Sequence, residues 1–315
     1  MPATSPAGAT IDIRRILCPV DFSESSRRAF DHAVAIARWY DATITLLHVC
    51  ADVPAAAYAP GSAVLPSMVL TTEDREQMAA SMATFATTES GPSVSLDFEV
   101  ARGSAAAEIL ARVDATRPDL LVMGTHGRSG FERLVLGSVT EKVLRKATCP
   151  VLSVPRGDAV PASTVLFKRI LCAVDFSDCA MHALNYAMSL AQEADARLTV
   201  LHVIEIPPEV PDGVGESVFG PPRSLREYVA DAETDRRERL TAAIPEAVRA
   251  YCTVDTMLAT GKPYREILRI ADEQQSDLIV IGIHGRGAAD LLFFGSTAQH
   301  VVRQAACPVL TLRTG

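Results

Sequence analysis

The sequence predicts an α/β fold that is built twice, as two tandem open parallel five-stranded sheets with helices on both faces. Two observations support this prediction. Strand and helix patterns alternate along the chain, which is typical of parallel βαβ units. The same series of patterns then recurs in the second half of the chain, which indicates a duplicated domain.

The strands of the first copy are predicted from short apolar or alternating runs. These runs are RRILCPV (14–20), TITLLHV (43–49), VSLDFEV (94–100), DLLVMG (119–124) and PVLSV (150–154). Helices are expected between them, at 24–40, 72–89, 104–115 and 138–147. Ser23 and Ser104 are the predicted N-caps of the first and third helices, because a serine hydroxyl can accept a hydrogen bond from a free helical N–H group.

The duplication is read directly from three ungapped alignments. They are 16–49 with 170–203, 101–130 with 259–288, and 149–154 with 307–312. Roughly half of the positions in the first alignment are identical, as expected for two copies of one domain. We therefore predict domains at 11–155 and 169–313, joined by a linker at 156–168 that is rich in proline, glycine and small residues.

Composition excludes several classes of protein. The 315 residues carry a net charge of −8, which argues against a general nucleic-acid binder. No run of about 18 apolar residues predicts a membrane span. The first residues lack the pattern of a signal peptide, and the seven cysteines are scattered, so we expect a reduced, cytoplasmic protein. Cys18 and Cys172, like Cys149 and Cys307, recur at equivalent positions and are predicted to be small core residues.

Both copies contain a glycine frame: Gly, two residues, Gly, nine residues, Gly-Ser. It reads GTHGRSGFERLVLGS at 124–138 and GIHGRGAADLLFFGS at 282–296. Each frame follows the fourth strand of its copy and leads into the fourth helix, at the sheet edge where open α/β folds bind ligands. Helix N–H groups and the helix dipole favour an anion there, and Ser138 could cap its helix and also donate its hydroxyl to a phosphate oxygen. Glycines that only form turns, and a serine that only caps, are the competing interpretation.

The frame, together with CPVDFS (18–23), CAVDFS (172–177) and the CPVL endings (149–152 and 307–310), resembles the universal stress protein family. The resemblance extends over nearly the whole chain as a tandem pair. It implies the strand order 3-2-1-4-5 of the adenine nucleotide alpha hydrolase-like fold. It also implies ATP binding, with Mg²⁺, because family members with the complete frame typically bind ATP.

The resemblance also implies which residues hold the nucleotide. The first aspartate of each copy would contact the adenosine portion, the valine that ends the second strand would flank the adenine, and the frame would hold ribose and phosphates. In the first copy these residues are Pro19, Val20, Asp21, Val49, Met123, Gly124, Gly127, Arg128, Gly137, Ser138 and Val139. In the second copy they are Val174, Asp175, Val203, Ile281, Gly282, Gly285, Arg286, Gly295, Ser296 and Thr297.

The two frames differ in charge. The first holds Arg128 and Arg133, whereas the second holds Arg286 alone and adds Asp290. Because cations attract a triphosphate and a carboxylate repels it, we expect the first site to bind ATP more tightly. No metal site and no catalytic residue are predicted, since the repeated histidines lack zinc-ligand spacing and no nucleophile has a partnered base.

The predicted function is that of an ATP-binding regulator or sensor of the stress response. A slow ATPase or phosphotransferase is one alternative, and an interaction module that binds no nucleotide is another. The proline-rich segments 51–70 and 204–223 are candidate lids or partner-binding loops, or plain connections. The resemblance further implies that the last strands of the two copies pair to form a pseudo-dimer within the chain, which could itself form a homodimer.

Overall fold

The computed structural model of the chain describes residues 11–51, 71–87, 94–126, 136–156, 167–205, 225–285 and 294–313. These residues form two compact units, 12–156 and 167–313. The predicted limits of the linker stay a prediction, since 157–166 lie outside the described residues. Among the helices that are described, none has both the length and the hydropathy needed to cross a membrane.

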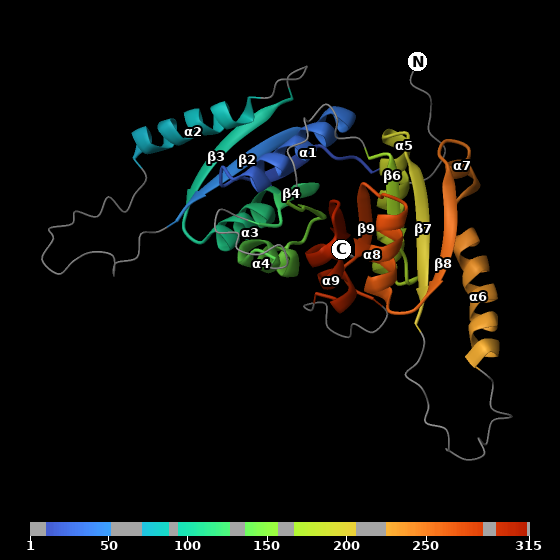
Figure 1. Ribbon diagram of the computed structural model, residues 1–315. Coiled ribbons are helices and arrows are strands. Elements are labelled where there is room, and N and C mark those ends of the chain that lie inside the picture. The colour runs from blue at the N-terminus through green and yellow to red at the C-terminus, as the bar shows by residue number, and fades with distance from the viewer. Residues whose placement is uncertain are drawn as a thin grey trace, which may run out of the picture. The chain divides into compact units, whose positions relative to one another are not determined.

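The first unit is one parallel sheet with a helix after each strand but the last (Figure 1). The strand order is β3-β2-β1-β4-β5, which confirms the expected order 3-2-1-4-5. The elements are β1 (Arg15–Pro19), α1 (Glu24–Tyr40), β2 (Thr43–Cys50), α2 (Thr72–Ala86), β3 (Leu96–Arg102), α3 (Ala105–Thr116), β4 (Leu120–Gly124), α4 (Ser138–Lys146) and β5 (Val151–Val154).

The second unit repeats this topology, with the strand order β8-β7-β6-β9-β10. Its elements are β6 (Arg169–Ala173), α5 (Asp178–Glu193), β7 (Arg197–Ile204), α6 (Leu225–Ala242), α7 (Glu246–Arg249), β8 (Val254–Thr260), α8 (Pro263–Glu273), β9 (Leu278–Gly282), α9 (Ser296–Gln304) and β10 (Val309–Leu312). The sequence does not predict α7, because a single helical turn is too short to show a periodic pattern.

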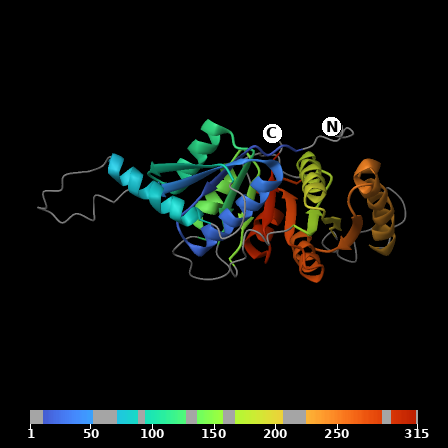
Figure 2. The ribbon, with the colours of Figure 1, turned by 90° about the horizontal axis from the view of Figure 1, so that it is seen from above.

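Helices cover both faces of each sheet, as Figures 1 and 2 show. In the first unit α1 packs against β1 and β4, whereas α3 packs against α4 and against β2 and β3. The central strands β1 and β6 are therefore buried on both faces, and Leu17 and Leu171 are at most 1% exposed. This double burial explains why these strands are continuous apolar runs without alternation.

Four cysteines at repeated positions belong to, or border, the cores of their units. Cys18 and Cys172 are completely buried on the central strands, and burial raises the pKa of both thiols. Burial also raises the pKa of Cys149 and of Cys307 to about 12. These thiols stay protonated at neutral pH. The burial of Cys18, Cys149 and Cys172 confirms the prediction of small core residues, whereas Cys307 is only partly buried.

Both serines that the sequence predicts as N-caps lie at the starts of their helices, but only one of them makes a capping hydrogen bond. The Ser23 hydroxyl accepts a hydrogen bond from the Ser26 N–H at 3.2 Å, which confirms Ser23 as the N-cap of α1. Ser104 occupies the predicted N-cap position of α3, but its side chain makes no capping hydrogen bond. Gly103, directly before it, has a φ of 137°, a backbone conformation that favours glycine.

One arginine joins α1 to the end of α2. The Arg27 guanidinium donates to the Phe85 carbonyl and, at 3.0 Å, to the Thr87 carbonyl, which lie at the C-terminus of α2. It also lies 5.4 Å from the centre of the Phe85 ring. The Arg27 Nε atom is 3.4 Å from Oδ1 of Asp31, whose carboxyl group is buried. Desolvation raises the pKa of Asp31 to about 6, although the nearby guanidinium groups oppose the shift.

We expect the carboxyl of Asp31 to make stability depend on pH. Its pKa is higher in the folded than in the unfolded chain, so its contribution is greatest below about pH 4 and is lost as pH rises toward 6. The free energy of unfolding of the parent, minus that of Asp31→Asn, should fall by about 2 kcal/mol between pH 4 and pH 7. Urea unfolding at both pH values measures this difference, and a constant difference would contradict the burial account.

Candidate nucleotide-binding site

Each glycine frame begins and ends where the sequence places it. Gly124 ends β4 and Ser138 begins α4, and likewise Gly282 ends β9 and Ser296 begins α9. Both frames thus join the carboxyl end of a strand to the start of a helix. Three of the predicted binding residues, Gly127, Arg128 and Arg286, lie outside the described residues.

The first glycine of each frame is required by packing inside its unit. A Cβ atom on Gly282 would lie 2.9 Å from Cys179 Sγ and 3.0 Å from the Ala180 nitrogen, at the start of α5. A Cβ atom on Gly124 would lie 2.3 Å from Ser25 Oγ in the equivalent turn of α1. Contacts this short are not found in proteins, so the strand and the helix approach closely only because the side chain is absent.

The last glycine of each frame closes the loop on itself. The Gly295 N–H donates to the Ile283 carbonyl at 2.8 Å, and the Gly137 N–H donates to the Thr125 carbonyl at the same distance. A Cβ atom on Gly295 would lie 2.5 Å from that carbonyl oxygen. The ends of each frame are therefore tied together, and the helix start is fixed beside the strand end.

The helices that follow the frames begin without a side-chain cap. Gly295 is the N-cap of α9 and Gly137 is the N-cap of α4, and neither has a side chain that could accept from the helical N–H groups. Ser138 is the first residue inside α4, so the prediction that it caps this helix is wrong. The glycine fits the tight loop closure, and it leaves the first N–H groups of each helix available to an anion.

An aspartate stands beside each frame with a fixed orientation. Asp175 Oδ1 accepts from the Ser177 N–H at 3.0 Å and from the Ser177 hydroxyl at 2.6 Å. Its second oxygen faces the frame, and a Cβ atom on Gly285 would lie 2.8 Å from Oδ2. Asp21 makes the same pair of hydrogen bonds with Ser23. The turn holds one carboxylate oxygen and directs the other toward the glycine loop.

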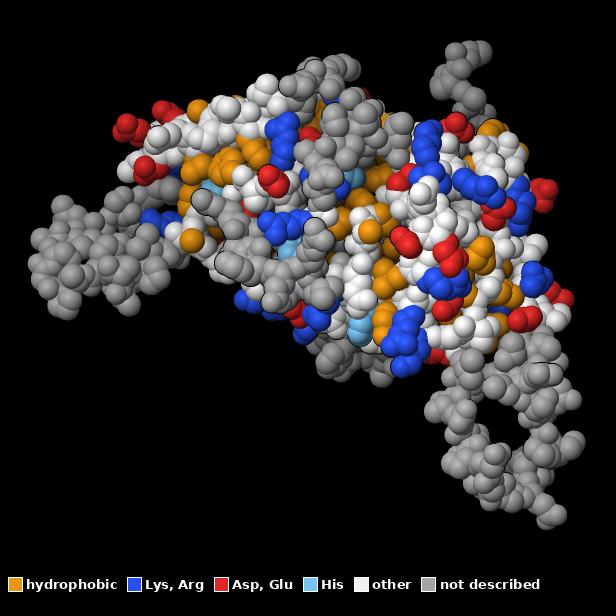
Figure 3. Space-filling view, viewed as in Figure 1, with side chains coloured by type: hydrophobic (Ala, Val, Ile, Leu, Met, Phe, Trp, Pro, Cys, Tyr) orange, Lys and Arg blue, Asp and Glu red, His pale blue; other side chains and the backbone are white. Residues whose placement is uncertain are grey.

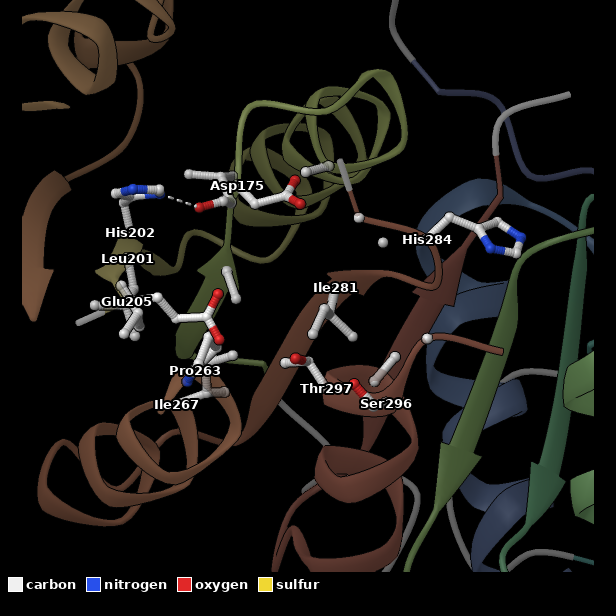
Figure 4. A pocket seen from close by; sticks show the side chains of 18 of the residues that line it. Asp175, Leu201, His202, Glu205, Pro263, Ile267, Ile281, His284, Ser296 and Thr297 are labelled. Carbon is white, nitrogen blue, oxygen red and sulfur yellow. Dashed lines mark hydrogen bonds between the residues drawn. The ribbon is translucent and has the colours of Figure 1, made fainter. Parts of the chain in front are cut away.

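In the second unit these groups line one cleft of about 610 Å³, within the usual size range of ligand pockets. Figure 4 shows Asp175 on one side of it and Ile281, Ser296 and Thr297 on the other. Every predicted residue of the second copy that is described lines this cleft: Val174, Asp175, Val203, Ile281, Gly282, Gly285, Gly295, Ser296 and Thr297.

The cleft has further lining residues that the sequence did not point to. They include Glu205 just after β7, Arg236 on α6, and Pro263 and Ile267 on α8. Glu205, Pro263 and Ile267 follow the ends of predicted strands, and this position near the carboxyl edge of the sheet is the sequence signal that could have pointed to them. No sequence motif marks Arg236, which reaches the cleft from the helix α6.

In the first unit the predicted residues also gather at one sheet edge. Pro19 ends β1, with Val20 and Asp21 after it, and Val49 lies near the end of β2. Met123 and Gly124 end β4, which pairs with β1, while Gly137, Ser138 and Val139 form the start of α4. One bond at this edge has no counterpart in the second unit: the Thr140 hydroxyl donates to the Gly124 carbonyl at 2.9 Å, where the second unit has Ala298.

The repeated histidines of the second strands have a structural role. Nδ1 of His202 lies 2.7 Å from the Val174 carbonyl, and Nδ1 of His48 lies 2.8 Å from the Val20 carbonyl. Because a carbonyl only accepts, Nδ1 carries the proton in both rings. Each bond ties the end of one strand to the loop before the aspartate. Across the described residues, no group of acidic, histidine and cysteine side chains has the arrangement of a metal site.

Charged side chains of both signs are interspersed on the described surface in Figure 3. Arg269, for example, donates to Glu266 at 2.6 Å and to Glu273 at 2.7 Å along α8. Pairs of this kind on an exposed helix contribute little to stability. On this face they leave no broad area of positive charge.

The repeated fold, the glycine loops and the oriented aspartates define a tandem α/β protein with a candidate ligand site at the carboxyl edge of each unit. The family model described as "Universal stress protein family" matches residues 12–155 and again 166–313. The chain therefore belongs to the universal stress protein family. This finding confirms the resemblance seen in the motifs.

Curated relatives carry the same family name. A universal stress protein of Mycolicibacterium smegmatis is 26% identical over 306 residues, which covers 95% of this chain and 96% of the relative. The "Universal stress protein in QAH/OAS sulfhydrylase 3'region" of Thermus aquaticus is 40% identical over 148 residues, covering 47% of this chain and all of the relative. The first relative thus matches both units, and the second corresponds to a single unit.

Solved structures support the fold. A universal stress protein from Archaeoglobus fulgidus aligns with a TM-score of 0.65 at 23% identity, covering 97% of this chain and 98% of that one. A putative universal stress protein from Pseudomonas aeruginosa aligns with a TM-score of 0.64 at 20% identity, covering 97% and 95%. Both alignments extend over both units of this chain, so the two-unit architecture is found in other solved proteins.

The two kinds of glycine in the frame predict two kinds of variant. Gly282→Ala should lower the free energy of unfolding by about 1–3 kcal/mol, because the added Cβ meets the backbone of α5. Gly285→Ala should change it by less than about 0.5 kcal/mol, since its Cβ meets only the end of the Asp175 side chain. Urea unfolding of both variants measures the difference in the free energy of unfolding. Equal destabilisation would contradict the claim that Gly282 is required by packing whereas Gly285 leaves room for a ligand.

Proposed function

We propose that the chain binds ATP with Mg²⁺ at the carboxyl edge of each unit and acts as a nucleotide-dependent regulator or sensor in the stress response. One observation carries the proposal. In the cleft of the second unit, an oriented carboxylate at Asp175 lies opposite the uncapped start of α9, with Gly285 close to that carboxylate. A nucleotide carries both hydroxyl donors and a polyanion on one molecule, so it can use both groups.

The phosphates would lie at the start of α9. The N–H groups of Ser296 and Thr297 have no partner within the helix, because they belong to its first turn. The positive end of the helix dipole attracts an anion to this position. The Ser296 hydroxyl, at the first helical position, can add a donor. No side-chain cap has to be displaced, since Gly295 supplies none.

The ribose would lie against Asp175. The Oδ2 atom is an acceptor directed at the glycine loop, and ribose hydroxyls are donors that fit such an acceptor. Because Ser177 holds Oδ1, the carboxylate keeps its orientation before any ligand arrives. Such preorganisation lowers the entropic cost of binding.

The base would lie on apolar side chains at the other end of the cleft. Val203, Ile281 and Ile267 come from β7, β9 and α8 and provide surfaces for an aromatic ring. Ile267 and Ile281 are at most 5% exposed, so the surface they provide is fixed by the core beneath it. Apolar walls with a few placed polar groups are the usual composition of a cofactor site.

Magnesium fits this arrangement as a companion of the phosphates. The ion generally keeps several waters and takes its remaining ligands from phosphate and one or two carboxylates. A preformed cluster of protein ligands is therefore unnecessary. When bound, Mg²⁺ would neutralise part of the phosphate charge, while the chain itself positions the nucleotide through Asp175 and the helix amides.

The first unit supplies the same elements in Asp21, Gly124 and the start of α4. Arg128, Arg133, Arg286 and Asp290 lie outside the described residues. The expectation that the first cleft binds ATP more tightly, which depends on these charges, stays a prediction.

Replacing the aspartates by asparagine should weaken binding without loss of the fold. Asparagine keeps the Oδ1 acceptor for Ser177 or Ser23, but it replaces the outward oxygen by an amide group that cannot accept from a ribose hydroxyl. We expect Asp175→Asn and Asp21→Asn each to raise the Kd for ATP at its own cleft by about ten- to hundredfold. Equilibrium dialysis with labelled ATP measures this change.

Asp255→Asn is the matched control, because Asp255 lies on β8 and is paired with Arg197 outside the cleft residues. Its affinity for ATP should equal that of the parent. Unchanged affinity in Asp175→Asn and Asp21→Asn together would contradict the assignment of the ribose end. Product formation measured in the same samples would report any hydrolysis separately from binding.

A further inference from the structure

The cleft of the second unit carries a carboxylate at the end away from the start of α9. Glu205 follows β7 directly and lines the cleft with Pro263 and Ile267 of α8. In Figure 4 its side chain extends toward Pro263 and Ile267, while Ser296 lies at the opposite end of the cleft. Glu205 is an exposed residue that lines the cleft beside the apolar side chains of Pro263 and Ile267.

No group within the described part of the chain is hydrogen-bonded to the carboxylate of Glu205. Arg236 is the cationic residue among the lining residues, and its guanidinium is paired with its neighbour Asp235. Glu205 is thus an acceptor with open positions that faces the cleft. An ionised carboxylate accepts hydrogen bonds and has no proton to donate.

If the proposed function holds, Glu205 lies at the end of the cleft that receives the base. With phosphates at α9 and ribose at Asp175, the base extends toward β7 and α8. The edge of a purine that lies farthest from its sugar carries the substituent at position 6. This substituent is an amino group in adenine and a carbonyl in hypoxanthine and guanine.

We propose that Glu205 determines the base specificity of the second cleft by accepting a hydrogen bond from the 6-amino group of a purine. A 6-oxo purine would place a carbonyl oxygen against the carboxylate, and two acceptors repel each other. The second cleft therefore selects adenine nucleotides against 6-oxo purine nucleotides through a side chain, in addition to the shape of the pocket.

The first unit has no carboxylate at the equivalent position. The register that aligns His48 with His202 aligns Ala51 with Glu205, and an alanine methyl group neither accepts nor repels at this position. At this aligned position the second unit therefore has a hydrogen-bond acceptor for the base, and the first unit has none.

Competition between ATP and inosine triphosphate tests this inference in the full chain. Asp21→Asn is included so that the second cleft dominates binding, and the ratio of the two Kd values is measured. We expect Glu205→Gln to lower the preference for ATP by about five- to tenfold, because the amide can turn its NH₂ group toward a 6-carbonyl. Glu246→Gln, on α7 and outside the cleft residues, removes the same charge and should leave the ratio unchanged.

A reciprocal variant tests the same chemistry without altering Glu205. In a chain with Asp175→Asn, which leaves the first cleft dominant, Ala51→Glu should raise the preference for ATP over inosine triphosphate by a similar factor. Circular dichroism and urea unfolding of each variant confirm that the chain is folded.

The outcomes separate this inference from the proposed function. ATP binding with the same ratio in Glu205→Gln as in the parent would overturn the role of Glu205 and leave ATP binding intact. Preference of the Asp21→Asn chain for guanosine triphosphate would also overturn it, since guanine presents its N1–H and 2-amino donors to a carboxylate in a different pose. Absence of nucleotide binding by the parent would overturn both proposals.

Discussion

The end of β9 meets the first turn of α5 with room for a hydrogen atom and no more. A Cβ atom on Gly282 would be 3.0 Å from the Ala180 nitrogen, and Gly124 has the same relation to Ser25 in the first unit. This contact brings the start of a capped helix against the strand that carries the glycine frame. The aspartate before that helix is thereby held beside the frame, so the shape of the cleft depends on the contact.

The turn that carries the aspartate is strained in both units, and its neighbours hold it. Phe22 and Phe176 adopt φ angles of 62° and 63°, which bulky residues rarely do. The centre of each phenylalanine ring lies 4.7 Å from the centre of a histidine ring, that of His48 or His202. Each histidine is hydrogen-bonded to the carbonyl of the residue before the aspartate. Such backbone strain costs about 1–3 kcal/mol and persists only where surrounding contacts fix it. The contacts here fix the direction of Asp21 and Asp175.

The repeated sequence patterns made the fold predictable, but they did not show which frame glycines are needed for packing and which allow a ligand to approach. Apolar runs and the Ser23 cap are local patterns, so β1, α1 and the order of elements follow from them. The roles of the glycines do not follow from local patterns. A Cβ atom on Gly282 would collide with Cys179, and one on Gly295 would collide with Ile283, and these contacts form only when the chain is folded. Glu205 and Arg236 lie in the same cleft through separate elements, and no motif links them. The frame is thus partly a packing signal, and the approach of Gly285 to Asp175 carries the stronger indication of a ligand.

The central claim is that each unit holds one nucleotide at its carboxyl edge. Calorimetric titration of Mg·ATP into nucleotide-free protein, read for stoichiometry, tests it most directly. The account predicts two sites per chain, of unequal affinity. Absence of binding would contradict it, and would leave the oriented aspartates and glycine loops as parts of a duplicated interaction module.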